Sequence, residues 1–591
     1  MLHKKKYSQG VITALVAGMM LGVLSLGTLV LELGRYVAAQ TQLSAAAGSG
    51  ASSMIAFYDS DLYERYGLLA IDHKSFTESR CKDYVQFNSD LNNNYNSNNL
   101  STLYDVEQVE MTGLYNLTYP SVLKRQLLTR AKYHVVATDY VLNTETAESF
   151  FRGWEEKCRF VAAEMDQVMI NAYSFAADTR SPATAAALTS LADVFKDRML
   201  TGTGGTSVVT NTDYNLVLSD ATVKQLPSKT GTVKSPSTAD DEQIIDNTVL
   251  NAIDRVGEDI SALGTVTEYN ETDISSKVLT DMEALSKYMD HAYTYMMGQE
   301  CYIDGFAASS ELALLVKDLT QSMPAAYHML QSDLNGQVLL NNYIIGNFSN
   351  KNRLAAGYMG PSAGKNYGAS NHNTTFHAAC TEYIIAGNAS EKQNQTVAYR
   401  AMLAIRMINN LYMLLNQPEY DPYDPSVVAT YLAWAYYESC VDMWLLSEYN
   451  LAVPFNKTQP LLPMHDPARI TAAFATRDFA DGMSKLGWYN GETFVIPGSE
   501  AYNYTDTMSL LMWFVPNSTK LLRVADLIQL EMRYRQQYVN GGTATFLMSE
   551  QNTYCRVKVT AKLRAMLPII SLGSTGSIQG TSFRAIRYSG Y

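Results

Sequence analysis

The sequence has few cysteines, few charged residues and no excess of positive charge, and each shortage excludes a class of protein. Six cysteines in 591 residues are too few for a scaffold held together mainly by disulfides. A formal net charge of -13 argues against a nucleic-acid-binding protein, which normally carries a basic surface. Only 17% of the residues are charged and 47% are hydrophobic, which predicts folded cores rather than general disorder.

The sequence also lacks the motifs of the common enzyme classes. It has no Gly-x-Ser-x-Gly and no His-Glu-x-x-His, and the segment 360–366 resembles a phosphate-binding loop but ends in asparagine where a hydroxyl must bind magnesium. Four candidate metal ligands without the paired spacing of zinc sites are His372, His377, Cys380 and Glu382. We therefore expect no catalytic residues, no metal and no cofactor, in a protein that is not an enzyme.

The amino end carries the one long apolar stretch. Lys4, Lys5 and Lys6 precede an uncharged run from Tyr7 through Leu31. The run has about 25 residues, more than a removed signal sequence needs and enough to cross the bilayer core with some tilt. Because lysines favour the cytoplasmic side, we expect a single-pass protein with a cytoplasmic amino end and an extracytoplasmic bulk.

Small residues recur within this run. Ala14, Gly18 and Gly22 are spaced by four and share one helix face, where two membrane helices could approach closely. Glycine is also common in membrane helices in general, so the spacing supports self-association and ordinary composition about equally. Glu32 and Arg35 are three residues apart, which predicts an ion pair at the outer membrane interface.

The helix is expected to continue beyond the membrane, because no proline occurs before Pro120. Farther along, apolar spacing predicts a strand over 104–114, a helix ending at Gly387, a capping box of Ser390 with Gln393, and three further helices. Those helices cover residues 403–414, 427–446 and 521–532, and two helical stripes are expected at 249–263 and 278–296.

A strand is expected over 555–565, where apolar and polar residues alternate. Its polar face carries four cations, Arg556, Lys558, Lys562 and Arg564. These cations could protect a strand edge from aggregation, or could attract an anionic partner to an acidic protein. The segment 543–548 is a candidate hairpin partner for this strand.

Several short motifs together resemble a known family. They are Val30–Tyr36, Gln42–Ala46, Tyr58–Asp59, Leu62–Leu69, Glu382–Asn388, Ile405–Arg406 with Asn409–Asn410, and Arg523–Gln529. The first of them resemble the membrane anchor of TadE/TadG-like proteins of tight-adherence (Tad/Flp) pilus systems. The whole set resembles a large uncharacterised ectodomain family of Gram-positive anaerobes that carries such an anchor.

This resemblance implies a structural or accessory component of a Tad-like pilus or secretion system, with other such components and membrane lipid as partners. One departure is that Leu15 stands where prepilin-like members carry glutamate, five residues after Gly10. That departure argues against prepilin processing. The alternatives are an adhesin or wall-polymer-binding protein and, third, an exported hydrolase.

The expected fold class is α+β, mainly helical, with small antiparallel sheets outside the membrane. From the amino end we expect a cytoplasmic tail (1–9), a transmembrane helix (10–33), a helical extension (34–70), a membrane-proximal lobe (71–200), a linker or loop rich in threonine, glycine and serine (201–241), a helical region (242–350) and a carboxy-terminal α+β lobe (351–591).

Overall fold

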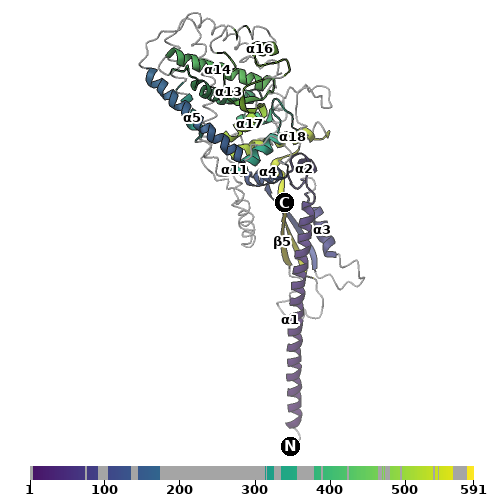
Figure 1. The fold of residues 1–591 in the computed structure, drawn as a ribbon. Helices are drawn as coiled ribbons and strands as arrows, with labels where there is room; N and C mark the ends of the chain where they lie inside the picture. The colour runs from purple at the N-terminus through teal and green to yellow at the C-terminus, as the bar shows by residue number, and fades with distance from the viewer. Residues whose placement is uncertain are drawn as a thin grey trace. The chain divides into compact units, whose positions relative to one another are not determined.

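The computed structural model shows helices and small antiparallel sheets, so the α+β class is confirmed for the part of the chain that it describes (Figure 1). The described residues are 4–72, 76–90, 104–134, 144–172, 313, 316–317, 319–324, 334–355, 379–387, 391–421, 425–463, 469, 472, 479–492, 495–536, 540–543, 545–563 and 582–591.

The chain divides into two compact units. The first contains Met1–Tyr119 and Leu547–Tyr591, and the second contains Pro120–Phe546. The first unit therefore joins the two ends of the sequence. We expected 351–591 to form one lobe, but Leu547–Tyr591 belongs to the first unit.

Helix α1 dominates the first unit and runs without a break over Lys4–Ile55. The helix expected beyond residue 33 continues as far as Ile55, whereas the expected extension reached residue 70. A short helix follows: α2 (Ser60–Tyr66) begins at Asp59, whose carboxylate accepts a hydrogen bond from the Leu62 amide, and ends at Gly67 with φ 68°. Helix α3 (Glu78–Asp90) then packs against α1.

A three-stranded antiparallel sheet completes the first unit. Its strands are β1 (Tyr104–Asn116), β4 (Asn552–Leu563) and β5 (Ser582–Gly590), in the order β1-β4-β5. The basic strand is therefore central, and its cations do not protect an edge. The expected hairpin partner at 543–548 is wrong, because β4 pairs with β1 and β5 while Met548 begins a short 3-10 helix, η8 (Met548–Glu550).

The expected alternation along the basic strand is confirmed. From Thr553 to Leu563 every second residue of β4 is buried, and this face packs on α1 and joins a core that includes α3. Gly50 of α1 lies close to α3, since a Cβ there would come within 2.7 Å of Val85 Cγ2. The helix contributes mostly small residues to the core, namely Ala39, Leu43, Ala46, Ala47, Ala51 and Met54.

The second unit is mainly helical. Its helices are α4 (Pro120–His134), α5 (Thr144–Ala172), α11 (Leu334–Asn347), α12 (Cys380–Ala386), α13 (Glu391–Leu415), α14 (Pro425–Glu448), α16 (Phe479–Leu486), α17 (Tyr504–Leu511), the 3-10 helix η6 (Met512–Phe514) and α18 (Asn517–Tyr534). A two-stranded antiparallel sheet joins β2 (Val453–Lys457) to β3 (Gly498–Tyr502).

Helices α13 and α14 pack side by side in this unit (Figure 1), and both contact β2. The helices expected at 403–414, 427–446 and 521–532 lie within α13, α14 and α18, and α12 ends at Gly387 as predicted. Other predictions fall outside the described residues: the linker 201–241, the helical stripes at 249–263 and 278–296, and Ser390 of the capping box.

Candidate functional site

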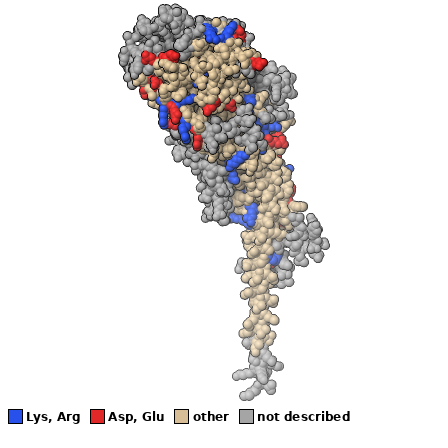
Figure 2. Space-filling view, in the orientation of Figure 1, with Lys and Arg blue, Asp and Glu red and all other residues tan. Residues whose placement is uncertain are grey.

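The amino-terminal half of α1 is an apolar helix with no packing partner inside the described chain. Its large side chains are exposed from Ile12 to Val37, with Met19 at 65% and Leu31 at 69%. Figure 2 shows the part of this stretch nearest the amino end as a tan column without charged residues. By length and composition α1 is long and apolar enough to cross a membrane, since it contains an 18-residue window with a mean hydropathy of 2.2.

The carboxy-terminal half of the same helix is buried in the core of the first unit. The change occurs at Tyr36, whose ring packs edge-on against Phe583 of β5 with centroids 5.6 Å apart. From Ile12 to Leu31, before the Glu32–Arg35 pair, the exposed stretch extends roughly 30 Å at 1.5 Å per residue. The hydrocarbon core of a bilayer is about 30 Å thick, so this stretch can span it before packing begins.

The face of small residues is open. Ala14 is exposed, and a Cβ built on Gly18 or Gly22 would meet nothing within 4 Å. On the same side, Ser25 Oγ donates to the Gly22 carbonyl at 2.9 Å. Lys4, Lys5 and Lys6 form the first turn of α1, and their side chains lie outside the described part.

The ion pair expected from sequence spacing is present. Arg35 Nη1 lies 2.9 Å from Glu32 Oε1, and their side chains are 15–16% exposed. The pair therefore lies where the exposed apolar half of α1 ends and the half buried in the core begins. Glu32 Oε2 is buried and accepts no hydrogen bond from the residues that the structure describes.

The cations of β4 make contacts within the sheet. Lys558 Nζ donates to both carboxylate oxygens of Glu110 at 3.0 Å, and Arg556 Nη2 donates to Thr112 Oγ1 at 3.1 Å. Lys562 is exposed beside Asp105 in the register, and Arg564 is outside the described residues. Because β1 supplies acidic partners, this face carries mixed charge rather than a purely basic field.

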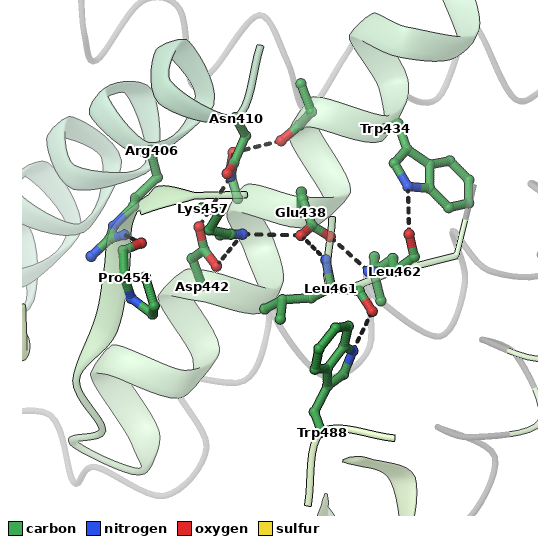
Figure 3. Close-up of polar contacts among 12 residues, drawn as sticks. Arg406, Asn410, Trp434, Glu438, Asp442, Pro454, Lys457, Leu461, Leu462 and Trp488 are labelled. Carbon is green, nitrogen blue, oxygen red and sulfur yellow. Dashed lines mark hydrogen bonds and ion pairs between the residues drawn. The ribbon is translucent and has the colours of Figure 1, made fainter. Parts of the chain in front are cut away.

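Sequence patterns did not reveal the most polar site, which lies inside the second unit (Figure 3). Lys457 of β2 has a fully buried side chain, and its Nζ lies 3.0 Å from Glu438 Oε1 and 2.7 Å from Asp442 Oδ1. Glu438 also accepts hydrogen bonds from the amides of Leu461 and Leu462. Burial raises the pKa of Glu438, and the Lys457 ammonium opposes that shift.

Helix α13 supplies the other side of this network. Asn410 Nδ2 donates to Asp442 Oδ2 and to Ser439 Oγ, both at 3.0 Å. Arg406 donates to the carbonyls of Pro454 at 2.8 Å and Val453 at 3.2 Å, and burial lowers the pKa of this guanidinium. The network thus ties α13, α14 and β2 together, and its carboxylates are occupied by protein donors.

A second polar cluster joins α12 to α17 and α18. The buried Glu382 carboxylate accepts from the Lys351 amide at 2.8 Å and from the Tyr504 hydroxyl at 2.9 Å. Tyr383 donates its hydroxyl to Asp526 Oδ2 at 2.7 Å. Burial raises the pKa of Asp526 to about 7, although the Tyr383 hydrogen bond and the Arg523 charge act in the opposite direction.

Arg523 closes the carboxyl end of α12. Its Nη1 donates to the carbonyls of Ile384 and Ile385, each at 2.6 Å. The guanidinium lies so close to Gly387, which has φ 70°, that a Cβ there would come within 2.4 Å of Nη2. Glycine is therefore required both for the left-handed turn and for the space that the arginine fills.

The candidate metal ligands are not brought together in the described residues. His372 and His377 lie outside them. Glu382 Oε1 accepts from Lys351 and Tyr504, and its Oε2 accepts from the Thr381 hydroxyl at 3.1 Å. The part of the chain that the structure describes contains no group of three or more histidine, cysteine, aspartate or glutamate side chains placed to hold a metal ion.

Comparison of the chain with protein-family models, with curated proteins and with solved structures gives no match. The functional argument therefore rests on the chain's own residues. Their arrangement supports membrane attachment through α1 and rigid internal packing of the second unit.

Proposed function

We propose that this chain is a single-pass, membrane-anchored surface protein whose role is structural or accessory rather than enzymatic. The observation that carries the proposal is that α1 is one unbroken helix with an exposed apolar half and a buried half. Exposing a large aliphatic side chain to water costs about 1.5–3 kcal/mol. A row of such side chains is therefore costly in water and favourable in lipid.

The orientation follows from charge. Lys4, Lys5 and Lys6 precede the apolar half, and basic residues remain on the cytoplasmic side of the membrane. The second unit and the part of the first unit that follows Arg35 then lie outside the cytoplasm. Retention of the anchor is supported by its length and by Leu15, which replaces the glutamate of processed prepilin-like chains.

A Tad-like pilus or secretion system is the proposed setting. Support comes from the resemblance of the anchor motifs to TadE/TadG-like proteins and from the stiffness of a helix that is continuous from the membrane into the core. The open face of Ala14, Gly18 and Gly22 offers a packing surface to another membrane helix, either of a second copy or of another component.

An adhesin or wall-polymer receptor is the second candidate. The observation favouring it is an exposed tyrosine pair in the first unit, Tyr58 at 42% and Tyr63 at 38%, with ring centroids 5.4 Å apart. Such amphipathic rings make good contact surfaces. A hydrolase is less well supported, since the buried carboxylates Glu382, Glu438 and Asp442 are all engaged by protein donors.

Membrane attachment can be tested by fractionation of the full-length chain. Leu21 and Leu24 are 68% and 65% exposed, and arginine at the centre of a span costs about 2.5–3.5 kcal/mol per residue. Leu21→Arg with Leu24→Arg should move the protein out of the carbonate-resistant membrane fraction. The matched pair Leu21→Ile with Leu24→Ile should stay there, and equal partitioning of both variants would contradict an anchor.

The pilus assignment needs a separate experiment. Surface appendages and the secretion complex should be purified from the native cells, and the chain should be detected in one of them by mass spectrometry. Its absence from both, together with binding of purified ectodomain to isolated cell wall, would favour the receptor instead.

A further inference from the structure

Lys157 of α5 lies between the side chains of two asparagines from other elements. Its Nζ donates to Asn409 Oδ1 on α13 at 2.6 Å and to Asn456 Oδ1 on β2. The side-chain amide of Asn456 is itself held, because Nδ2 donates to Glu500 Oε2 on β3 at 2.8 Å. The amine, the carboxamide and the carboxylate therefore form a chain of hydrogen bonds. They come from three elements, α5, β2 and β3, of one compact unit.

Aromatic rings surround the amine. Nζ lies 5.1 Å from the centroid of the Phe455 ring and 5.5 Å from that of Tyr412. Phe455 packs in turn against Trp154, with centroids 5.4 Å apart, and against Tyr502 at 5.8 Å. Burial removes the amine from water and lowers the pKa of Lys157 to about 8, with Glu500 opposing the shift.

We propose that Lys157 and Asn456 join in an intramolecular isopeptide bond, with Glu500 as the residue that transfers the proton. The observation that carries the proposal is the alignment of Lys157 Nζ, the Asn456 carboxamide and the Glu500 carboxylate within a partly buried aromatic cluster. The site would be an autocatalytic cross-link rather than a binding site for an external substrate.

The reaction balances without any oxidant, reductant or cofactor. The neutral Nζ of Lys157 adds to Cγ of Asn456, and the Cγ–Nδ2 bond then breaks. Nζ gives up one proton, which the Glu500 carboxylate accepts and passes to Nδ2. The nitrogen leaves as ammonia, and an amide between Nζ and Cγ remains.

Holding the two reactants in contact is what makes such a reaction feasible, since correct placement replaces a very unfavourable bimolecular encounter. The alignment depends on an unusual backbone. Glu500 has φ 56°, which non-glycine residues seldom adopt. Gly498, two residues earlier, has φ 152°, and a Cβ there would collide with Pro454 and with the Asn456 carbonyl. Residues held in such conformations cluster at functional sites.

Asn456 is the acceptor rather than Asn409. Both carbonyl oxygens receive a hydrogen bond from Lys157, but only the Asn456 amide is bonded to a carboxylate in the part of the chain that is described. Without a nearby carboxylate, the leaving nitrogen would have no proton carrier. Asn409 therefore orients the amine, and its substitution should slow the reaction without abolishing it.

The cross-link would close a covalent loop between α5 and β2, which lie far apart in the sequence. Cross-links that close long loops restrict the unfolded chain. A surface protein exposed to shear or to proteases would gain resistance to unfolding, and the linked chain would keep a compact, faster-migrating form after denaturation.

Mass spectrometry of the purified full-length chain tests the proposal. After incubation at about pH 8, the wild-type protein should be lighter than its sequence by one ammonia molecule, and a digest should yield a branched peptide joining Lys157 to Asn456. Fragmentation of that peptide separates a cross-link from a succinimide at an asparagine, which has the same mass loss.

The variants distinguish the roles. Lys157→Arg and Asn456→Ala should show the full mass and no branched peptide, Glu500→Gln should form the link at least tenfold more slowly, and Asn409→Ala should still form it. Recovery of Lys157 and Asn456 in separate, unmodified peptides from folded wild-type protein would overturn the proposal. A branched peptide through Asn409 would overturn the assigned acceptor.

Discussion

The ring of Tyr36 packs against the ring of Phe583 with centroids 5.6 Å apart at an interplanar angle of 62°. The contact joins α1 to β5, which comes from the other end of the chain. It lies just above the Glu32–Arg35 ion pair, so the folded unit begins within one helical turn of the apolar half. This packing fixes the direction of the apolar half of α1 relative to the sheet.

Two glycines of α1 should respond oppositely to the same substitution. A Cβ on Gly48 would have its nearest neighbour at 3.9 Å, so Gly48→Ala should stabilise the first unit by about 0.5–1 kcal/mol through helix propensity. A Cβ on Gly50 would come within 2.7 Å of Val85 Cγ2, so Gly50→Ala should destabilise it by about 1–2 kcal/mol. Hydrogen exchange of the β4 amides measures the stability of the first unit in both variants. Equal changes in the two variants would contradict the packing of α1 on α3.

Self-association of the apolar half should depend on the small-residue face. Gly18→Ile should weaken dimerisation of the isolated span by roughly 1 kcal/mol or more in a membrane reporter assay, because a branched side chain keeps the backbones apart. Met20→Ile is the control, because Met20 lies about 160° around the helix from Gly18 at 3.6 residues per turn. An unchanged signal from Gly18→Ile would mean that the glycines receive another protein's helix or none.

Local periodicity predicted the elements well but could not predict their partners. The alternation from Cys555 to Leu563 indicated a strand with one buried face, and the absence of proline indicated the length of α1. The pairing of β4 with β1 joins residues hundreds of positions apart, and no local pattern encodes it. For that reason the basic strand was assigned a neighbouring hairpin partner.

The two polar clusters of the second unit could not be predicted from the sequence, for a related reason. Glu382, Arg406, Asn410 and Asp526 all stood within the short motifs that carried the family resemblance. Their apolar neighbours predicted helices, whereas their own roles arise only when the helices meet. The available signal was a charged residue on the buried face of an apolar helix, as Arg406 is in α13.

The buried ion pairs of Lys457 should be essential to the second unit. Lys457→Met leaves the Glu438 and Asp442 carboxylates without their cation and should cost about 3–5 kcal/mol. Lys485→Met removes an exposed pair with Asp481 and should cost less than about 1 kcal/mol. Denaturant titration of the full-length chain compares them. Similar costs for the two substitutions would refute the buried network.

Asp526 should make stability depend on pH. Its pKa is raised from 3.8 to about 7 in the folded chain. Between about pH 4 and 7 the folded state retains a proton that the unfolded state has lost, so stability falls as the pH rises through this window. The urea midpoint of unfolding, measured between about pH 4 and 7, should fall less steeply for Asp526→Asn than for wild type. The control variant Asp481→Asn should fall as steeply as wild type. Parallel curves for wild type and Asp526→Asn would exclude this contribution.

Protease accessibility of intact protoplasts tests the central claim, which is that α1 anchors the chain and that everything after Arg35 lies outside the cytoplasm. External protease should digest the bulk of the chain and leave a short membrane-embedded fragment that contains Lys4–Lys6 and the apolar half of α1. A cytoplasmic marker must remain intact in the same sample, and lysed protoplasts provide the control for complete digestion. Survival of the full-length chain in intact protoplasts, with digestion only after lysis, would contradict the proposed topology.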